Sequence, residues 1–178
     1  MFSKFIRKFI LSLSSLSPVV LTFWFKEFST NFNLADGWIY FLIFLTISII
    51  TFFMIRFAKK KLEEVEVKIH SIQNADSEVI SYIFAYILPL IGFDIKLTLF
   101  ILFLYLFIVF TTNIYHFNPI LGLFGYHYYT VSFDNGITFV LISKKTLMNA
   151  NEISSVVQLD DYTLLEVDKS EINKKGIK

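Results

Sequence analysis

The side chains used most often in catalysis and metal binding are few and scattered in this chain. The three histidines, His70, His116 and His127, are not spaced as metal ligands, and the absence of cysteine excludes thiol nucleophiles, zinc–cysteine sites and disulfides. The neighbouring carboxylates of Asp160 and Asp161 are typical of a turn, and the sequence has no glycine-rich phosphate loop. We therefore expect no enzymatic activity, no metal and no cofactor.

The composition indicates a membrane protein. Of the 178 residues, 55% are hydrophobic and only 17% are charged, whereas soluble domains carry about 25% charged residues. Phenylalanine occurs 22 times, and the mean hydropathy is +0.62. These values exclude a disordered chain, a coiled coil and an ordinary cytosolic enzyme. The net charge of +1 favours no class of partner.

Four stretches with almost no charge predict a bundle of four transmembrane helices within residues 1–115. We place the spans at about residues 9–25, 38–57, 79–93 and 97–115, with a charged loop at 56–78.

The first stretch also has a feature of a signal peptide, since basic residues precede an apolar run. However, Phe23, Trp24 and Phe25 occupy the place where a small-residue cleavage site would lie, so we expect a retained helix. The third stretch is short and contains Pro89 and Gly92, which leaves a tilted span or a re-entrant segment open.

The distribution of basic residues favours four spans. With the N-terminus inside, only Lys26 and Lys96 lie outside, which follows the positive-inside rule. We therefore predict a multi-pass protein of the cell inner membrane with both termini in the cytoplasm.

No charged residue interrupts the interior of these spans, which argues against a pump or a proton relay. Ser12 and Ser15 share one helix face, either as the lining of a pore in an oligomer or as small residues at a packed helix interface. We favour helix packing. Pro89 predicts a helix kink, which could serve gating or only shape.

The tail at residues 116–178 predicts a small cytoplasmic β-rich module with antiparallel strands. Asn135-Gly136 between strands 126–133 and 137–143 is a strong hairpin signal. A two-residue turn would place four side chains in the core: Phe133, Val131, Val140 and Ile142. A second hairpin is expected to join residues 156–159 to 162–167.

The loop after the second span is compatible with two structures. Residues 64–70 alternate in polarity as a one-sided strand does, while Leu62, Val65 and Ile69 also fit a helical stripe. We favour a strand at 63–72 that joins the sheet of the tail, followed by Asp76 or Ser77 as the cap of the third helix.

Two surface features are candidates for recognition. Tyr126, Tyr128 and Tyr162 could dock a protein partner or could equally pack against the helices. The run 59–61, Lys-Lys-Lys, could bind anionic lipid or nucleic acid, but a stop-transfer cluster is the simpler interpretation. Because acidic residues balance the basic ones in the cytoplasmic segments, we expect no direct contact with nucleic acid.

Several phrases of the sequence resemble one family closely. They are Ser77-Glu78-Val79-Ile80-Ser81-Tyr82, Ala85-Tyr86-Ile87-Leu88-Pro89, Asn118-Pro119-Ile120-Leu121, Gly125-Tyr126-His127-Tyr128-Tyr129, Leu141-Ile142-Ser143-Lys144-Lys145 and Val157-Gln158-Leu159-Asp160-Asp161-Tyr162. Together they resemble the KwaA family, the membrane subunit of the Kiwa anti-phage defence system of bacteria, over nearly the whole chain.

The resemblance implies a homo-oligomer, which we expect to be a tetramer, in the inner membrane. It also implies a cytoplasmic DNA-binding partner, a KwaB-like protein, and a role in sensing phage attack at the envelope. Beside this sensor and scaffold, a pore-forming effector that depolarises the cell is the alternative.

Overall fold

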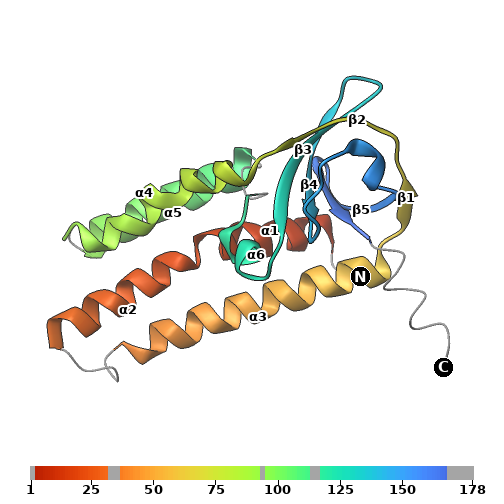
Figure 1. Ribbon diagram of the computed structural model, residues 1–178. Helices are drawn as coiled ribbons and strands as arrows, with labels where there is room; N and C mark the ends of the chain where they lie inside the picture. Colours follow the sequence, from red (N-terminus) through yellow and green to blue (C-terminus); the bar gives the residue numbers. More distant parts are fainter. Residues whose placement is uncertain (1–2, 32–36, 93–94, 113–116, 168–178) are drawn as a thin grey trace, which may run out of the picture. The chain divides into compact units, whose positions relative to one another are not determined.

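The computed structural model describes residues 3–31, 37–92, 95–112 and 117–167 (Figure 1). The chain divides into two compact units, and each unit combines segments that are far apart in the sequence. The helical unit comprises residues 2–54 and 78–124, and the β unit comprises residues 55–77 and 125–178 together with Met1.

The helical unit is built from helices in pairwise contact: α1 packs against α5, and α2 packs against α4. The helices in chain order are α1 (Lys4–Leu16), α2 (Pro18–Asn31), α3 (Trp38–Lys61), η1 (Asp76–Tyr82), α4 (Ile83–Ile87), η2 (Leu88–Leu90), α5 (Ile95–Thr112) and α6 (Pro119–Leu123). The last residues of α3, from 55 onward, belong to the β unit.

The first predicted span, at 9–25, consists of two helices rather than one. The break falls at Ser17, because Pro18 has no N–H to continue the hydrogen-bond ladder of the helix, although Ser17 itself keeps helical backbone angles. The helix also begins earlier than predicted, at Lys4, since the side chain of Ser3 accepts a hydrogen bond from the N–H of Ile6 as an N-cap.

Within the residues that the structure describes, two helical stretches are long and apolar enough to cross a membrane, Lys4–Ser29 and Trp38–Lys61. The helix Ile95–Thr111 is apolar but shorter. The predicted span at 79–93 is a succession of η1, α4 and η2, of which the last contains Pro89. Four membrane-spanning helices are therefore not shown, although apolar helices occur in all four predicted regions.

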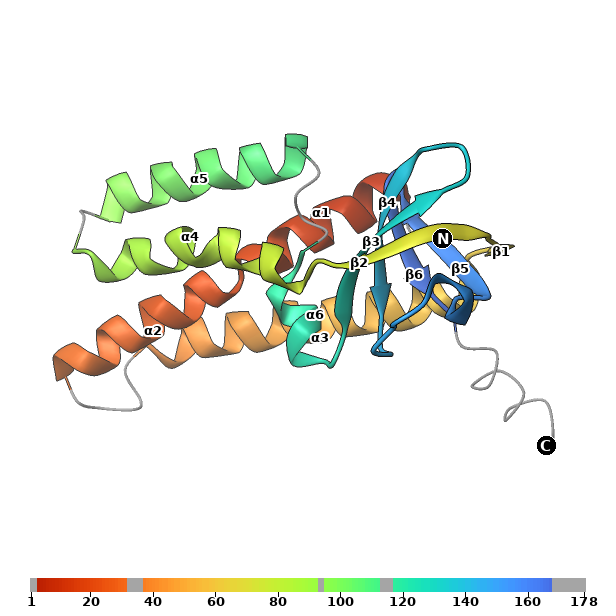
Figure 2. The ribbon, with the colours of Figure 1, turned by 45° about the horizontal axis from the view of Figure 1, so that its top comes forward.

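The β unit is a mixed six-stranded sheet with the order β1-β5-β6-β4-β3-β2 (Figure 2). Its strands are β1 (Glu64–Glu66), β2 (Ile69–Asn74), β3 (His127–Phe133), β4 (Thr138–Ser143), β5 (Ser155–Asp160) and β6 (Thr163–Glu166), with a 3-10 turn η4 (Ala150–Glu152) before β5. The prediction of a purely antiparallel module is wrong at one pairing, since β4 and β6 are parallel. Residues 144–154 connect β4 to β5. This long connection allows the β5–β6 hairpin to place β6 beside β4 with both strands running in the same direction.

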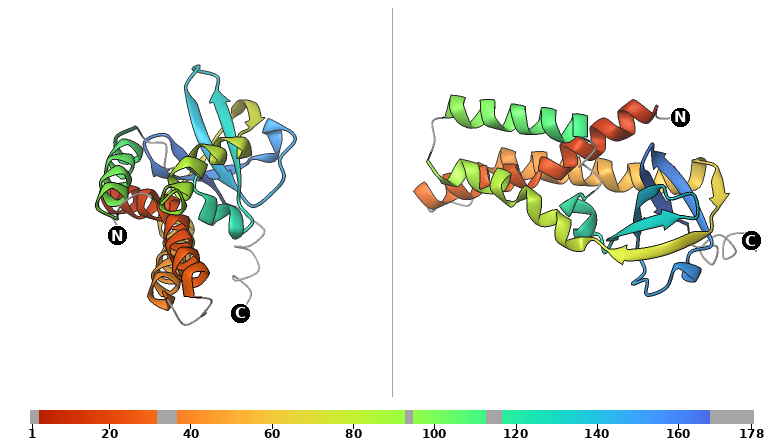
Figure 3. Two further views of the ribbon diagram at one scale, coloured as in Figure 1. Left: turned by 90° about the vertical axis from the view of Figure 1, so that its left-hand side faces the viewer. Right: turned by 90° about the horizontal axis from the view of Figure 1, so that it is seen from above.

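The sheet is strongly curved, as Figure 3 shows. Strands β1 and β2 form its two edges, yet only Val67 and Lys68 separate them in the chain. These residues bridge at most about 11 Å, whereas the edges of a flat six-stranded sheet lie about 24 Å apart. The sheet therefore curls into an open barrel, which is filled by a buried cluster. Its members are Tyr129, Val131, Leu141, Leu147, Ile153, Val156 and Leu164.

The prediction that the loop at 63–72 joins the sheet of the tail is confirmed, but the loop forms two strands, β1 and β2, instead of the single strand predicted. The second tail hairpin is also confirmed, as β5 and β6. The prediction of Asp76 or Ser77 as a cap before the helix is wrong, because both residues lie within η1. The carboxylate of Asp76 instead accepts a hydrogen bond from the N–H of Tyr128 on β3.

The predicted register of the first hairpin is wrong by one residue. The loop has three residues, 134–136, because Gly136 at φ 79° donates its N–H to the carbonyl of Phe133, and Phe133 pairs with Ile137. Val131 consequently lies opposite Phe139 and not opposite Val140. Since a shift of one residue exchanges the faces of a strand, Leu141 and Phe139 take the positions at the barrel cluster that were predicted for Val140 and Ile142. Ile142 is nevertheless fully buried, on the other face of β4, where Val140 is half-buried.

Candidate functional site

The three tyrosines proposed for partner docking differ in accessibility. Tyr128 is 1% exposed and Tyr126 is 6% exposed, whereas Tyr162 is 52% exposed. A buried ring cannot dock a partner from solvent, so the structure corrects the proposal for Tyr126 and Tyr128 and retains Tyr162 as a candidate.

Tyr162 ends a row of aromatic rings at one end of the barrel. Its ring centroid lies 6.0 Å from that of Phe139, which in turn lies 5.1 Å from the ring of Phe133 in an edge-to-face contact. Phe133 and Phe139 pack against the buried cluster, and the exposed side chain of Ile137 lies between them in sequence. This row therefore joins the core to an exposed aromatic ring.

Tyr126 has an electrostatic role that the sequence did not reveal. The Nζ of Lys59, in the last turn of α3, lies 5.4 Å from its ring centroid, and the Nζ of Lys144, just after β4, lies 5.1 Å from it. Both distances are typical of cation–π contacts. Two basic segments of the β unit therefore meet over one buried ring.

Asp76 forms a polar site that joins two strands of the β unit. Its carboxylate accepts a hydrogen bond of 2.7 Å from the backbone N–H of Tyr128 and lies 3.0 Å from Nδ1 of His127. The side-chain amide of Asn74 also donates to it, at 3.2 Å. Partial burial acts to raise the pKa of this carboxyl, but the hydrogen bonds from Tyr128, His127 and Asn74 outweigh it, so the pKa lies below the usual value of 3.8.

The site at Asp76 was missed because its partners are remote in sequence. The local sequence pattern around Asp76 indicated a helix cap, so the same carboxylate was assigned to the following helix. The segment 125–129, which carries part of the family resemblance, holds both Tyr128 and His127.

Ser12 and Ser15 are both fully buried in the helical unit. The hydroxyl of Ser15 donates to the carbonyl of Ser12 at 2.8 Å, and the carbonyl of Ser15 accepts from the hydroxyl of Tyr86 at 2.8 Å. The hydroxyl of Ser12 has no hydrogen-bond partner in the described part of the chain. Burial within one chain is what the packing interpretation requires, whereas a pore lining would have to face an aqueous path.

Asn118 anchors the start of α6 to α1. Its buried amide donates to the carbonyl of Leu11 at 3.3 Å and to the hydroxyl of Ser14, while its side-chain oxygen accepts from the N–H of Ile120 at 3.0 Å. Pro119 follows as the first helical residue, in the position where its missing N–H costs nothing. Pro89, the predicted kink, is buried within the 3-10 turn η2.

A further cluster of chemically capable side chains lies between β4 and β6. The hydroxyl of Ser143 donates to the carboxylate of Glu166, and Nζ of Lys145 lies 3.3 Å from the same carboxylate. Ser143 is fully buried and its proton is engaged by Glu166. The cluster therefore joins two parallel strands and cannot present a nucleophile to a substrate.

The two described histidines, His70 and His127, each contact a different acidic residue. His70 lies 3.6 Å from Asp134 in an exposed pair, His127 contacts Asp76, and His116 lies outside the described residues. In the ranges that the structure describes, no three histidine, cysteine or acidic side chains gather as metal ligands.

The fold and these sites define a protein of apolar helices that carries a small, curved β-sheet module with a filled interior. Residues 7–165 match the family described as anti-phage protein KwaA. The chain therefore belongs to the KwaA family of anti-phage defence proteins, as its sequence phrases had suggested. No curated protein and no solved structure matches the chain.

Proposed function

We propose that the protein is a non-enzymatic component of the bacterial inner membrane that senses phage attack at the envelope and anchors a cytoplasmic DNA-binding partner. Family membership supplies the defence role. The observation that carries the rest is the division of the chain into apolar helices and a separate β unit with a packed core. Such a division suits a membrane anchor that presents a binding module.

The surface of the helices supports a place in the bilayer. On α5, large apolar side chains point outward, among them Phe103 at 63% exposed and Phe107 at 59%. In water such a surface would be a liability, whereas lipid or another copy of the chain would cover it. The exposed apolar area thus supports both the membrane location and a homo-oligomer, for which we favour a tetramer.

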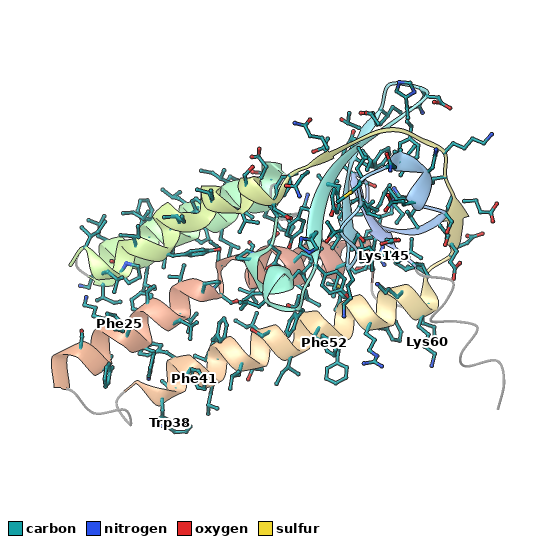
Figure 4. The ribbon with its side chains drawn as sticks, in the orientation of Figure 1. Phe25, Trp38, Phe41, Phe52, Lys60 and Lys145 are labelled. Atoms are coloured by element: carbon teal, nitrogen blue, oxygen red, sulfur yellow. The ribbon has the colours of Figure 1, made fainter. Side chains whose placement is uncertain are left out.

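Aromatic residues mark one end of the helical unit. Figure 4 shows Phe25, Trp38 and Phe41 at the end where α2 and α3 approach each other. The ring of Trp24 lies 6.1 Å from that of Phe41. Tryptophan and its aromatic neighbours are typical of the membrane–water interface, so we place this end at the outer surface and Lys59–Lys61 at the cytoplasmic surface.

The partner is expected to bind the β unit through Tyr162. We propose a KwaB-like DNA-binding protein, with no direct contact between this chain and nucleic acid. The test is recovery of the partner from detergent extracts with Tyr162→Ala, using Met148→Ala as the matched control because Met148 is an exposed apolar side chain of the same unit. Tyr162→Ala should reduce recovery at unchanged melting temperature, and Met148→Ala should not. Equal recovery from both variants would remove Tyr162 from the interface.

A pore-forming effector remains the competing function. Membrane potential followed during phage challenge separates the two, because a scaffold leaves the potential intact when this chain is expressed alone. Rapid depolarisation by the chain alone, with no partner recovered, would favour the pore. The burial of Ser12 and Ser15 supports the scaffold.

A further inference from the structure

Strand β2 leaves one edge of the sheet open. It stands at the end of the strand order and pairs only with β3, along the border of the curved sheet (Figure 3). A bulge interrupts this pairing between Ile69 and Ser71, so the regular part of the edge is formed by residues 71–74. The side chains of Ser71, Gln73 and Asn74 are exposed. Another strand can therefore reach this edge.

The register identifies the backbone groups that point outward. Ala75, just after β2, donates its N–H to the carbonyl of Tyr128 at 2.8 Å. Successive residues of an antiparallel strand turn their N–H and C=O groups to opposite sides, so those of Ile72 and Asn74 point away from β3. Within the described ranges, these outward groups form no hydrogen bond. Unpaired donors and acceptors therefore lie along the edge.

The segment around η4 packs against β2 from the core side. Ile153, which follows η4, belongs to the buried cluster against which Ile69 and Ile72 pack. Side chains of a strand stand roughly perpendicular to the sheet, so this packing uses one face of β2. It leaves the outward backbone groups unpaired.

The two edges of the sheet differ in their protection against pairing. Natural edge strands are commonly short or charged, because an open edge pairs readily with another strand. Strand β1 has both features, since it has three residues and two of them are Glu64 and Glu66. Strand β2 has six residues and contains no lysine, arginine, aspartate or glutamate. The edge at β2 is therefore suited to a pairing that β1 opposes.

We propose that β2 pairs with β2 of a second copy of the chain, antiparallel and around a two-fold axis at Gln73. In this register Ile72 of each copy lies opposite Asn74 of the other, and the outward N–H and C=O groups of both residues form a ladder of hydrogen bonds. The pairing uses every outward group of the regular edge.

Charge favours a second copy as the occupant of this edge. At the two-fold axis Gln73 faces Gln73, so that two neutral amides meet, whereas the same pairing of β1 would set Glu64 opposite Glu66. Like charges directly opposite each other destabilise a pair of strands. The inference rests on the proposed homo-oligomer and gives it a defined contact in the β unit.

The absence of cysteine from the chain makes single-cysteine cross-linking a direct test. Full-length protein with Gln73→Cys is oxidised in inverted membrane vesicles. In the proposed pair the two Cα atoms at this position lie about 4.5 Å apart, within the range of about 4.4–6.8 Å that a disulfide requires. We expect most of this variant to become a disulfide-linked dimer that a reducing agent converts back to the monomer. Gln158→Cys, at an exposed position on β5, is the matched control and should remain a monomer.

A charge at the two-fold axis provides a second measurement. Gln73→Lys sets two ammonium groups opposite each other and should weaken self-association in detergent about fivefold, since a like-charged pair across two strands costs up to about 1 kcal/mol. Gln158→Lys makes the same change of charge on β5 and should associate as the wild type does. Because both positions are exposed, the melting temperatures of the two variants should equal that of the wild type.

The proposal is overturned if Gln73→Cys gives no dimer, or if both cysteine variants give equal amounts of dimer. A cross-link of Gln73→Cys to a different protein would also overturn it and would assign the edge to that partner. Native mass spectrometry of the wild type separates this inference from the proposed homo-oligomer. An oligomer without the cross-link rejects only the β2 contact, whereas a monomeric wild type rejects both.

Discussion

The carboxylate of Asp76 accepts a hydrogen bond of 2.7 Å from the backbone N–H of Tyr128, at the place where the chain leaves the β unit. The same carboxylate contacts His127 at 3.0 Å. One side chain thus fixes the start of β3 to the end of β2 just before the segment that leads into η1. Strand β2 is an edge of the sheet, so these contacts of Asp76 attach that edge to β3.

Replacement of Asp76 tests the importance of this attachment. In Asp76→Asn the charge is lost and the hydrogen bonds weaken, so we expect the free energy of unfolding of the β unit to fall by about 1 kcal/mol. Thermal melting in detergent measures the change. Asp134→Asn is the control, because the contact of Asp134 with His70 is exposed and such pairs contribute little. A larger loss in the control than in Asp76→Asn would contradict the assignment.

The lowered pKa of Asp76 predicts a dependence of stability on pH. Partial burial opposes the shift, but hydrogen bonds to the charged form keep the folded pKa below 3.8. The stabilisation by this group is therefore complete well above pH 3.8 and is lost as the pH falls through the folded pKa. The difference in stability between the wild type and Asp76→Asn should accordingly be largest near neutral pH and shrink in acid. A difference that stays constant down to pH 3 would show that the charge of Asp76 has no part in it.

The register of the first hairpin makes a sharp prediction about the core. Leu141 is fully buried in the barrel cluster, so Leu141→Ala should lower the free energy of unfolding by about 2–5 kcal/mol. Val140 lies on the other face and is half-buried, so Val140→Ala should cost clearly less. Proteolysis and thermal melting of the two variants provide the comparison. A greater loss of unfolding free energy in Val140→Ala than in Leu141→Ala would contradict this register and support the one expected from a two-residue turn.

The sequence was sufficient for the classes of element but not for their exact pairing. Polarity alternation at 64–70 and the Asn-Gly turn both led to real strands. In β2 and β3 the alternation reflects one face that packs against the core, whereas all three residues of β1 are exposed. The Asn-Gly pair did not determine the loop length, since Gly136 with positive φ serves a three-residue loop as well as a two-residue one. The parallel contact of β4 with β6 depends on a long connection, which leaves no local signal.

The candidate sites were predictable to a smaller extent. The small residues Ser12 and Ser15 were correctly placed in a helix, but their hydrogen-bond partners could not be named in advance. Residues such as Asn118, Lys144 and Asp76 have roles that depend on contacts across the fold. A single sequence does not contain the distances that create such sites.

The buried polar groups of α1 provide a prediction for the helical unit. Ser12→Ala removes a buried hydroxyl that has no partner in the described residues, so stability should be unchanged or higher. Asn118→Ala leaves the carbonyl of Leu11 and the hydroxyl of Ser14 without this donor, and should cost about 1–3 kcal/mol. Melting of the detergent-purified variants distinguishes them. If Ser12→Ala abolished phage protection while stability was retained, a functional hydroxyl and a pore would gain support.

The most direct test of the account is the membrane topology of the chain in living cells. Alkaline phosphatase, which is active only outside the cytoplasm, is fused after residue 167 and, separately, inserted in the segment 32–36 between α2 and α3. We predict no activity at the first position and activity at the second, with fluorescence of a green fluorescent protein fusion at the first position as the positive control. Phosphatase activity after residue 167 would place the β unit outside the cytoplasm and would contradict its role as an anchor for a cytoplasmic DNA-binding partner.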